Sequence, residues 1–465
     1  MSAKYTALAL VMLLAGCGLA GPNYQRPPLD LPGKYAEPAP GAAAPLAVPA
    51  DWWRLYGDAT LDRLVSSGLE KNTDVRIAVA RIEEAEAVLR EANATFFPLV
   101  EAGAGAGRSR SSMRTGTLPP TATPIRNNFQ LTASTTFEID FWGRLRRGAE
   151  AARAQYYASR YARDVVSLTL AAGIAQTYFA VRSLDAQIVV AGETLKAAEE
   201  SFDLAGKRAQ AGIVSDLDVN QADANRAQAA AQSKDLRRQR AVVVHQLGVV
   251  SGVLDLDVPP GDLRQLPAPP LPPAGLPSTL LERRPDVREA EAQLESANAL
   301  IGVARAAQFP TFSLTGALGV QSQELSTLFS TGAGIWSIGL GMVAPVIDGG
   351  RYAARTQQAE ARARQAAAAY EKTAQTAFRE VSDALSNVSL ASEAEQDLRV
   401  RVERAQNTLR LATLRYEAGY SAYLEVLDAQ RTLNDAQLAL VRNRQSYLAY
   451  TVDLMNALGG GWAAY

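Results

Sequence analysis

The sequence contains the same long segment twice, and this duplication limits what the chain can fold into. A first block recurs without a gap 212 residues later, where Asp74-Val75-Arg76 and Phe97-Pro98 match Asp286-Val287-Arg288 and Phe309-Pro310. A second block recurs 207 residues later, where Ala211-Gly212 matches Ala418-Gly419. A period near 200 residues is too long for a solenoid repeat. We therefore expect two large structural units, with a five-residue difference inside one loop.

The first seventeen residues have the pattern of a bacterial export signal. Lys4 provides a positive charge, Tyr5 to Leu14 is apolar, and Leu14-Ala15-Gly16-Cys17 follows, which is the order of a secretory signal peptide. The tetrad resembles the lipobox of bacterial lipoproteins, and this resemblance implies cleavage before Cys17 and lipidation of its sulfur. The residue after Cys17 is Gly18 and not Asp, and by the same resemblance this implies that the lipoprotein is sorted to the outer membrane. The alternative is an ordinary signal peptide in which Cys17 is incidental.

The composition excludes several classes of function. The net charge of −1 argues against nucleic acid as a partner, because phosphate binding needs a basic excess. The chain has one histidine and one cysteine, so neither a His-based triad nor a Cys/His metal cluster can be assembled. We therefore expect no enzyme, no cofactor and no metal site.

Each copy contains segments in which apolar and polar residues alternate, a pattern that predicts β-strands. In copy one the alternation runs from Phe129 to Phe141, with a weaker partner that begins at Val100. Copy two alternates from Phe312 to Val320 and from Trp336 to Met342. The sequence predicts two β-hairpins, at about residues 98–141 and 310–346.

Long helices are predicted around these hairpins. Asp58 to Ala94 lacks proline and predicts one helix before the first hairpin. After the hairpins, no proline occurs from Leu145 to Ala211 or from Tyr352 to Ala418, which predicts two helices on the order of 100 Å long. Partial heptads rich in alanine and leucine favour coiled-coil packing. Gly212 and Gly419 are expected to turn the chain into return helices.

The strands are typical of an outer-membrane β-barrel, since they are about ten residues long and have aromatic residues near their ends. No stretch after the signal peptide has the ~18 uninterrupted apolar residues of a transmembrane helix. Four strands cannot close, because the smallest such barrel has about eight. Two copies would give eight strands, and three copies would give twelve and leave a lumen. We therefore expect the chain to oligomerise.

These patterns predict a linear order of segments. It comprises a signal peptide at residues 1–16, a lipidated proline-rich tether at 17–50, repeat one at 51–258, a proline-rich connector at 259–277, repeat two at 278–458 and a tail at 459–465. Each repeat is expected to hold a helix, a β-hairpin and a long α-hairpin, with tips near residues 212 and 419.

Several motifs together resemble the outer-membrane factors of the TolC type, in the lipoprotein branch that serves tripartite efflux pumps. Besides the lipobox and the paired Phe-Pro steps, they are Arg415-Tyr416-Glu417-Ala418-Gly419, Tyr423-Leu424, Leu427-Asp428-Ala429-Gln430-Arg431 and Ala457 to Trp462. The resemblance covers essentially the whole mature chain. It implies a homotrimer in which a twelve-stranded outer-membrane barrel is continuous with an α-helical coiled-coil barrel in the periplasm. It also implies a periplasmic adaptor and an inner-membrane pump, of RND type, as partners.

The same resemblance assigns roles to the two tips. Leu424 and Asp428 would line the periplasmic constriction, and Tyr416, Arg415 and Arg431 would form the bonds that hold it shut. Asp216 and Asp218 are candidates on the other tip. The residues matching the adaptor-docking motif are Arg208, Ala211, Gly212, Arg415, Ala418 and Gly419. Copy one has Lys207-Arg208-Ala209 where copy two has Leu414-Arg415-Tyr416, so we expect the gate mainly in copy two.

Two other functions remain possible from the sequence. An exit duct for secreted proteins would use the same architecture. A structural coiled-coil lipoprotein would explain the heptads and the lipid, but not four amphipathic strands between the helices. The cargo of an efflux duct stays open, because drugs, metals, solvents and organic acids are all compatible with the sequence.

Overall fold

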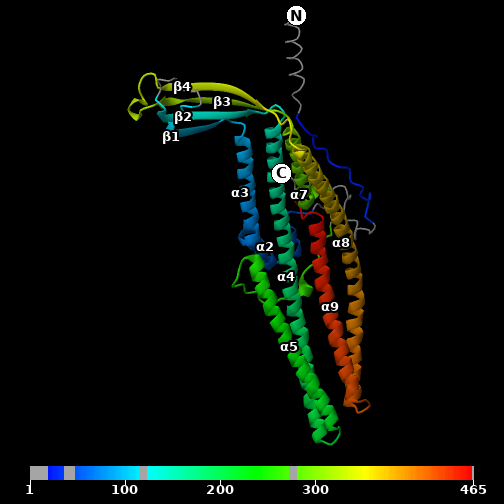
Figure 1. Ribbon diagram of the computed structural model, residues 1–465. Helices are drawn as coiled ribbons and strands as arrows, with labels where there is room; N and C mark the ends of the chain where they lie inside the picture. Colours follow the sequence, from blue (N-terminus) through cyan, green and yellow to red (C-terminus); the bar gives the residue numbers. More distant parts are fainter. Residues whose placement is uncertain (1–18, 36–47, 115–122, 272–279, 463–465) are drawn as a thin grey trace. The chain divides into compact units, whose positions relative to one another are not determined.

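The computed structural model describes residues 19–35, 48–114, 123–271 and 280–462 (Figure 1). The chain divides into two compact units. Unit 1 comprises residues 1–28, 82–159 and 290–370, and unit 2 comprises residues 29–81, 160–289 and 371–465. The predicted signal peptide and Cys17 lie outside the described residues, as does part of the predicted connector.

Unit 1 contains one antiparallel sheet with the strand order β1-β2-β3-β4 (Figure 1). The strands are β1 (Leu99–Arg110), β2 (Ile125–Ile139), β3 (Thr311–Ser322) and β4 (Gly334–Val343). This confirms the prediction of four strands in two hairpins. Pairing of β2 with β3 joins the hairpins, and β1 and β4 form the two edges of an open sheet.

The register of the sheet separates an apolar face from a polar one. On the apolar face, Leu131 lies opposite Ala104 of β1 and Val320 of β3, and the β4 side chains of Trp336 and Ile338 are 80% and 73% exposed. The polar face alternates with it and carries small or hydrogen-bonding residues: Gly103, Gly105, Gln130, Thr132, Ser134, Thr315, Gln321, Gly339 and Gly341. An exposed apolar face of this extent marks a surface that contacts lipid or another chain.

Two helices of equal length follow the hairpins. They are α4 (Arg144–Gln210) and α8 (Arg351–Glu417), each of 67 residues, so each is about 100 Å long. An 18-residue window of α4 has a mean hydropathy of 1.3, and within the described residues α4 is the one helix apolar enough to cross a membrane by composition. Part of the apolar character of α4 is explained by packing inside the protein, because Ile174, Tyr178 and Phe179 are fully buried in unit 2.

Glycine turns lead from the long helices into return helices. Gly212 and Gly419 adopt φ values of 72° and 79°, the left-handed region that favours glycine after a helix. The return helices are α5 (Asp216–Ser251) and α9 (Tyr423–Ala457). The predicted heptads are buried where they pack: Ala198 and Ala205 of α4 have no exposed surface.

The other helices are shorter than these four. They are η1 (Trp52–Tyr56), α2 (Ala59–Lys71), α3 (Thr73–Ala94), η2 (Leu263–Gln265), α6 (Leu280–Arg283), α7 (Pro285–Ala306) and η4 (Leu325–Thr327). The prediction of one helix from Asp58 to Ala94 was wrong, since the chain breaks at Asn72. The Asn72 backbone is extended, and its side-chain oxygen accepts a hydrogen bond of 2.7 Å from the Asp74 amide, which starts α3 as an N-cap.

The described start of the connector is fixed by buried ion pairs in unit 2. Asp185 of α4, 5% exposed, accepts a hydrogen bond of 2.5 Å from Arg240 of α5. Arg182 donates to the Pro259 carbonyl at 2.6 Å, and Arg240 donates to the Val258 carbonyl at 2.7 Å. Because these charges are paired and buried, removing one partner would leave a costly unpaired charge. This polar clamp holds the connector against α4 and α5.

Candidate functional site at the helical tips

The α4/α5 and α8/α9 turns, both in unit 2, form the tips that the sequence predicts to be functional. At each tip the chain is closed by two backbone hydrogen bonds. The Gly212 amide donates to Ala209 and the Ile213 amide to Arg208, while Gly419 donates to Tyr416 and Tyr420 to Arg415. These bonds satisfy the last helical carbonyls, in the pattern of a glycine-terminated helix.

A hydrophobic cluster joins the two tips. Its largest members are Tyr416 and Tyr423, which are 4% and 1% exposed and whose rings lie 5.6 Å apart at 58°. The other buried members are small or aliphatic: Ala205, Ala222, Ala412, Val426, Leu427 and Ala429. Since alanines of α4 and α5 pack against aromatic residues of α8 and α9, the two α-hairpins share one core.

Arg208 of α4 holds the end of α8. Its Nη1 donates to the Tyr416 carbonyl oxygen at 2.8 Å, and its guanidinium carbon lies 4.6 Å from the centre of the Tyr416 ring. The carbonyl end of a helix carries a partial negative charge, and an aromatic face attracts a cation. Arg208 therefore stabilises the last turn of α8 in two ways.

Both tyrosines stay protonated at neutral pH. Burial is the main cause that raises the pKa of Tyr416; the Asp218 carboxylate raises it further and Arg208 opposes the shift. Burial also raises the pKa of Tyr423, and the positive charge of Arg431 opposes this shift. These effects show that Asp218 of one tip and Arg431 of the other lie within electrostatic range of the tyrosine pair.

The hydroxyl of Tyr416 is buried without a hydrogen-bond partner among the described residues. Its predicted gate partners, Arg415 and Arg431, are exposed, and Arg415 instead lies 3.7 Å from Glu425. Within one chain, the structure therefore does not join Tyr416, Arg415 and Arg431 in a hydrogen-bonded group. A buried phenol without a partner is unfavourable, so a partner from another chain would stabilise it.

The predicted constriction residues lie on the free surface of α9. Leu424 is 60% exposed, and Asp428, one turn further along the helix, is also exposed. On the other tip Asp216 is exposed and Asp218 is half-buried. The docking-motif residues Ala211, Gly212, Ala418 and Gly419 are all exposed at the turns.

Two features of the site were not predicted from the sequence. Tyr423 was taken as part of a family motif, with no role assigned, yet its side chain is the most buried aromatic one of the tip core, only 1% exposed. A polar chain also crosses between the hairpins, in which Asn225 donates to Gln430 at 3.3 Å and Gln430 donates to Ser201 at 3.0 Å. Because arginine recurs at equivalent positions 208 and 415, the sequence could indicate that Arg208 matters. It could not indicate that Arg208 contacts Tyr416.

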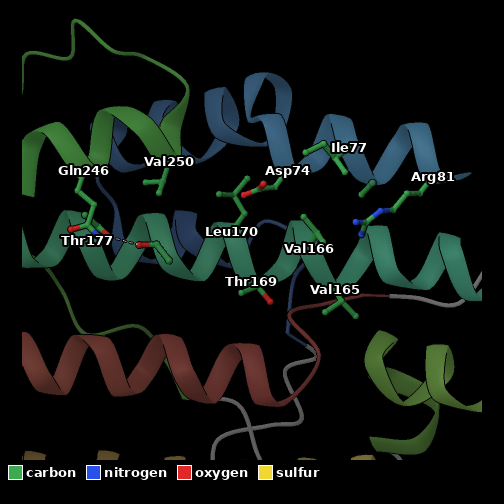
Figure 2. A pocket seen from close by; sticks show the side chains of 12 residues that line it. Asp74, Ile77, Arg81, Val165, Val166, Thr169, Leu170, Thr177, Gln246 and Val250 are labelled. Atoms are coloured by element: carbon green, nitrogen blue, oxygen red, sulfur yellow. Dashed lines mark hydrogen bonds between the residues drawn. The ribbon is translucent and has the colours of Figure 1, made fainter. Parts of the chain in front are cut away.

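A second candidate site is a groove of about 590 Å³ where α3, α4 and α5 meet in unit 2 (Figure 2). Figure 2 shows Ile77 and Asp74 of α3 on one side and Leu170 and Val166 of α4 on the other. The lining is mostly apolar, and Ile77 is 50% exposed. Among the residues that the structure describes, no group of three His, Cys, Asp or Glu side chains could hold a metal ion. The apolar lining suits the groove to packing against another apolar surface.

Comparison with known proteins identifies the class. The family model described as outer membrane efflux protein matches residues 64–253 and 276–460. The chain therefore belongs to the outer membrane efflux protein family, and its role is transport out of the cell through an outer-membrane channel.

Named relatives cover nearly the whole chain. The toluene efflux pump outer membrane protein TtgF of Pseudomonas putida is 35% identical over 473 residues, which span 99% of this chain and 98% of TtgF. The probable outer membrane lipoprotein SilC of Salmonella typhimurium is 32% identical over 467 residues, 99% of each chain. The solved structure of the outer-membrane channel OprN is 30% identical with a TM-score of 0.88, covering 95% of this chain and 99% of that one.

Proposed function

We propose that three copies of the chain form a passive exit duct for small molecules, with a twelve-stranded barrel in the outer membrane and an α-helical barrel in the periplasm. The observation that carries this proposal is the four-stranded sheet, which has two free edges and an exposed apolar face. Open edges cannot persist in lipid. Closure therefore needs strands from other copies, and twelve strands leave a lumen where eight are filled by side chains.

The proposal includes an anchor and partners. Cys17 would carry the lipid that attaches the chain to the outer membrane. A periplasmic adaptor would dock at the tips, through Arg208, Ala211, Gly212, Arg415, Ala418 and Gly419, and would connect the duct to an inner-membrane pump of RND type. Copies would pack together partly through the groove of Figure 2, because its lining is mostly apolar and is partly exposed in the single chain.

We also place the closing point of the duct at the tips. In a threefold tube each exposed residue of α9 recurs three times about the axis, so Asp428 becomes a ring of three carboxylates and Leu424 an apolar ring. Arg415 and Arg431 would supply bonds between chains, including one to the Tyr416 hydroxyl, which has no hydrogen-bond partner among the described residues. Asp216 and Asp218 would take a smaller part from the other tip.

The proposal is tested by the mass and the pore of the purified protein. Light scattering in detergent should give three copies of the mature chain, which lacks residues 1–16 of the 49.6 kDa full sequence. Planar bilayers should show pores after the oligomer is added. Heat-dissociated protein is the matched control and should give none. A stable oligomer of two copies, or an oligomer of three without pores, would contradict the proposal.

A further inference from the structure

The described N-terminal segment is fixed at the periplasmic end of the sheet in unit 1. The Ala20 amide donates to the Trp142 carbonyl at 2.9 Å, and Arg147, 2% exposed, donates to the Ala20 carbonyl at 3.3 Å. The side chain of Leu19 fills the space beside Gly143, where a Cβ atom would collide with it. Leu19 is therefore held directly after β2, at the start of α4.

Further contacts keep the segment in place. Gly21, with φ of 86°, packs so closely on Gly302 of α7 that neither position has room for a side chain. Arg26 pairs with Glu291 of α7 through two hydrogen bonds of 2.5 and 2.8 Å, the strong bidentate geometry, and Tyr24 donates to the same carboxylate at 3.3 Å. The start of the predicted tether is thus a fixed strap.

An apolar trough of about 490 Å³ lies on the sheet of the same unit. Thr135 of β2 and Gly316 of β3, which pair directly, form its floor because their side chains are small. Its lining residues are Pro98, Val100, Thr135, Phe137, Leu314, Thr315, Gly316 and Ile338. Their apolar side chains belong to the sheet face that we assign to lipid, and Val100 and Ile338 are 69% and 73% exposed.

The trough lies within reach of a lipid that starts at the strap. Trp142 stacks on Phe309 with ring centres 4.6 Å apart, and such aromatic residues mark the interface of a membrane. Trp142 follows Phe137 of the trough by five positions, a path of at most about 17 Å even if the chain is fully extended. A strand tilted by roughly 40° covers about 13 Å of depth over that path, within one leaflet of about 15 Å.

We propose that an acyl chain carried by Cys17 lies in this trough. Cys17 precedes Leu19 by two residues, and two residues of chain span at most about 7 Å. A lipid attached there has already lost most of its translational freedom. A free phospholipid would lose that freedom only on binding, so its binding to the trough would cost more entropy. The inference rests on the lipidation set out under Proposed function, and it assigns the chain's own lipid, rather than bulk phospholipid, to the trough.

The experiment uses a fatty acid with a photoactivatable diazirine, fed to cells that express the full chain. It enters lipoproteins and phospholipids alike. After irradiation and trypsin digestion, the N-terminal peptide that begins at Cys17 should be cross-linked to residues 127–144 of β2 or to residues 306–351 of β3 and β4. Cross-links from phospholipid give the same strand peptides without the N-terminal peptide, so mass spectrometry separates the two sources.

Two matched variants test the position of the acyl chain. Thr135→Leu fills the floor and should lower the yield of the N-terminal cross-link at least roughly fivefold, because an overfilled site leaves no room for the chain. Ala104→Leu adds the same side chain on the same apolar face, opposite Leu131 and outside the trough lining, and should leave the yield unchanged. Both variants should keep the wild-type oligomer on gels.

The outcomes separate docking from lipidation. A lipidated N-terminal peptide that cross-links only to phospholipid, or equally in Thr135→Leu and wild type, would overturn the docking and leave lipidation intact. An N-terminal peptide with an unmodified Cys17 would overturn both. Cys17→Ser provides the reference, since it should lose the N-terminal cross-link and keep the phospholipid ones.

Discussion

The two helical tips differ most clearly at a pair of arginines that occupy equivalent positions 207 residues apart. Arg208 folds inward, where it binds the Tyr416 carbonyl and covers the Tyr416 ring. Arg415 points outward, 60% exposed in its side chain, and pairs loosely with Glu425. The same residue in the same motif therefore has an internal structural role in one tip and a free surface role in the other.

The two tips also contribute different side chains to their shared hydrophobic core. The α8/α9 tip supplies the aromatic pair Tyr416 and Tyr423, and the α4/α5 tip supplies the alanines Ala205 and Ala222 against which the pair packs. The α8/α9 tip thus provides the large aromatic side chains. The α4/α5 tip provides small side chains that leave room for them, together with the positive charge of Arg208. A duplicated chain can in this way build one core from two copies whose residues no longer match, and the arginine of the α8/α9 copy, Arg415, stays exposed at the surface.

The largest expected effect comes from removing the central aromatic residue of that core. Tyr423→Ala should lower the free energy of local opening at the tips by about 3 kcal/mol, because a large buried ring is lost and a cavity remains. Hydrogen–deuterium exchange of the native oligomer should then show faster exchange at residues 414–427, by roughly 100-fold.

A change at an exposed apolar residue of the other tip should have almost no effect. Ile213 is 63% exposed, so Ile213→Ala should alter local opening by less than about 0.5 kcal/mol. Equal losses from Tyr423→Ala and Ile213→Ala would show that the tips do not differ in core packing.

The two equivalent arginines provide the next largest contrast. Arg208→Ala should lower the local stability of the α8 end by about 1.5 kcal/mol, since a charged hydrogen bond to a carbonyl and a ring contact are lost. Arg415→Ala should cost less than about 1 kcal/mol, because its ion pair is exposed. Hydrogen exchange of the Gly419 and Tyr420 amides reports both changes.

Arg208→Lys sharpens this test, because lysine keeps the charge but lacks the planar group that covers the ring. It should recover only part of the loss. If Arg415→Ala destabilises the α8 end as much as Arg208→Ala does, the inward and outward roles of the two arginines are not distinct.

Much of the fold followed from periodicity in the sequence. Alternation from Phe129 to Phe141 predicted β2, and proline-free stretches ending in Gly212 and Gly419 predicted the two α-hairpins, because strands and helices impose different repeats on a chain. The break at Asn72 was missed, since a side chain that caps a helix leaves the hydrophobic pattern unchanged.

The contacts between distant segments could not be predicted. Proline content identified the connector as irregular, but did not show that Arg182 and Arg444 donate hydrogen bonds to its carbonyls. A sequence does not show the partner of a buried arginine. The contact of Arg208 with Tyr416 was hidden for the same reason. Whether the sheet closes depends on other copies of the chain, so it remains a proposal.

The most direct test of the division between the tips is the conductance of the purified protein in planar bilayers. Asp428→Ala, alone or with Tyr416→Phe, should raise the conductance of single pores severalfold, because it removes a ring of three carboxylates from the proposed constriction. Asp216→Ala, the comparison on the other tip, should raise it much less. Unchanged conductance in Asp428→Ala would remove this residue from the gate, and an equal rise in Asp216→Ala would contradict a gate carried mainly by the α8/α9 tip.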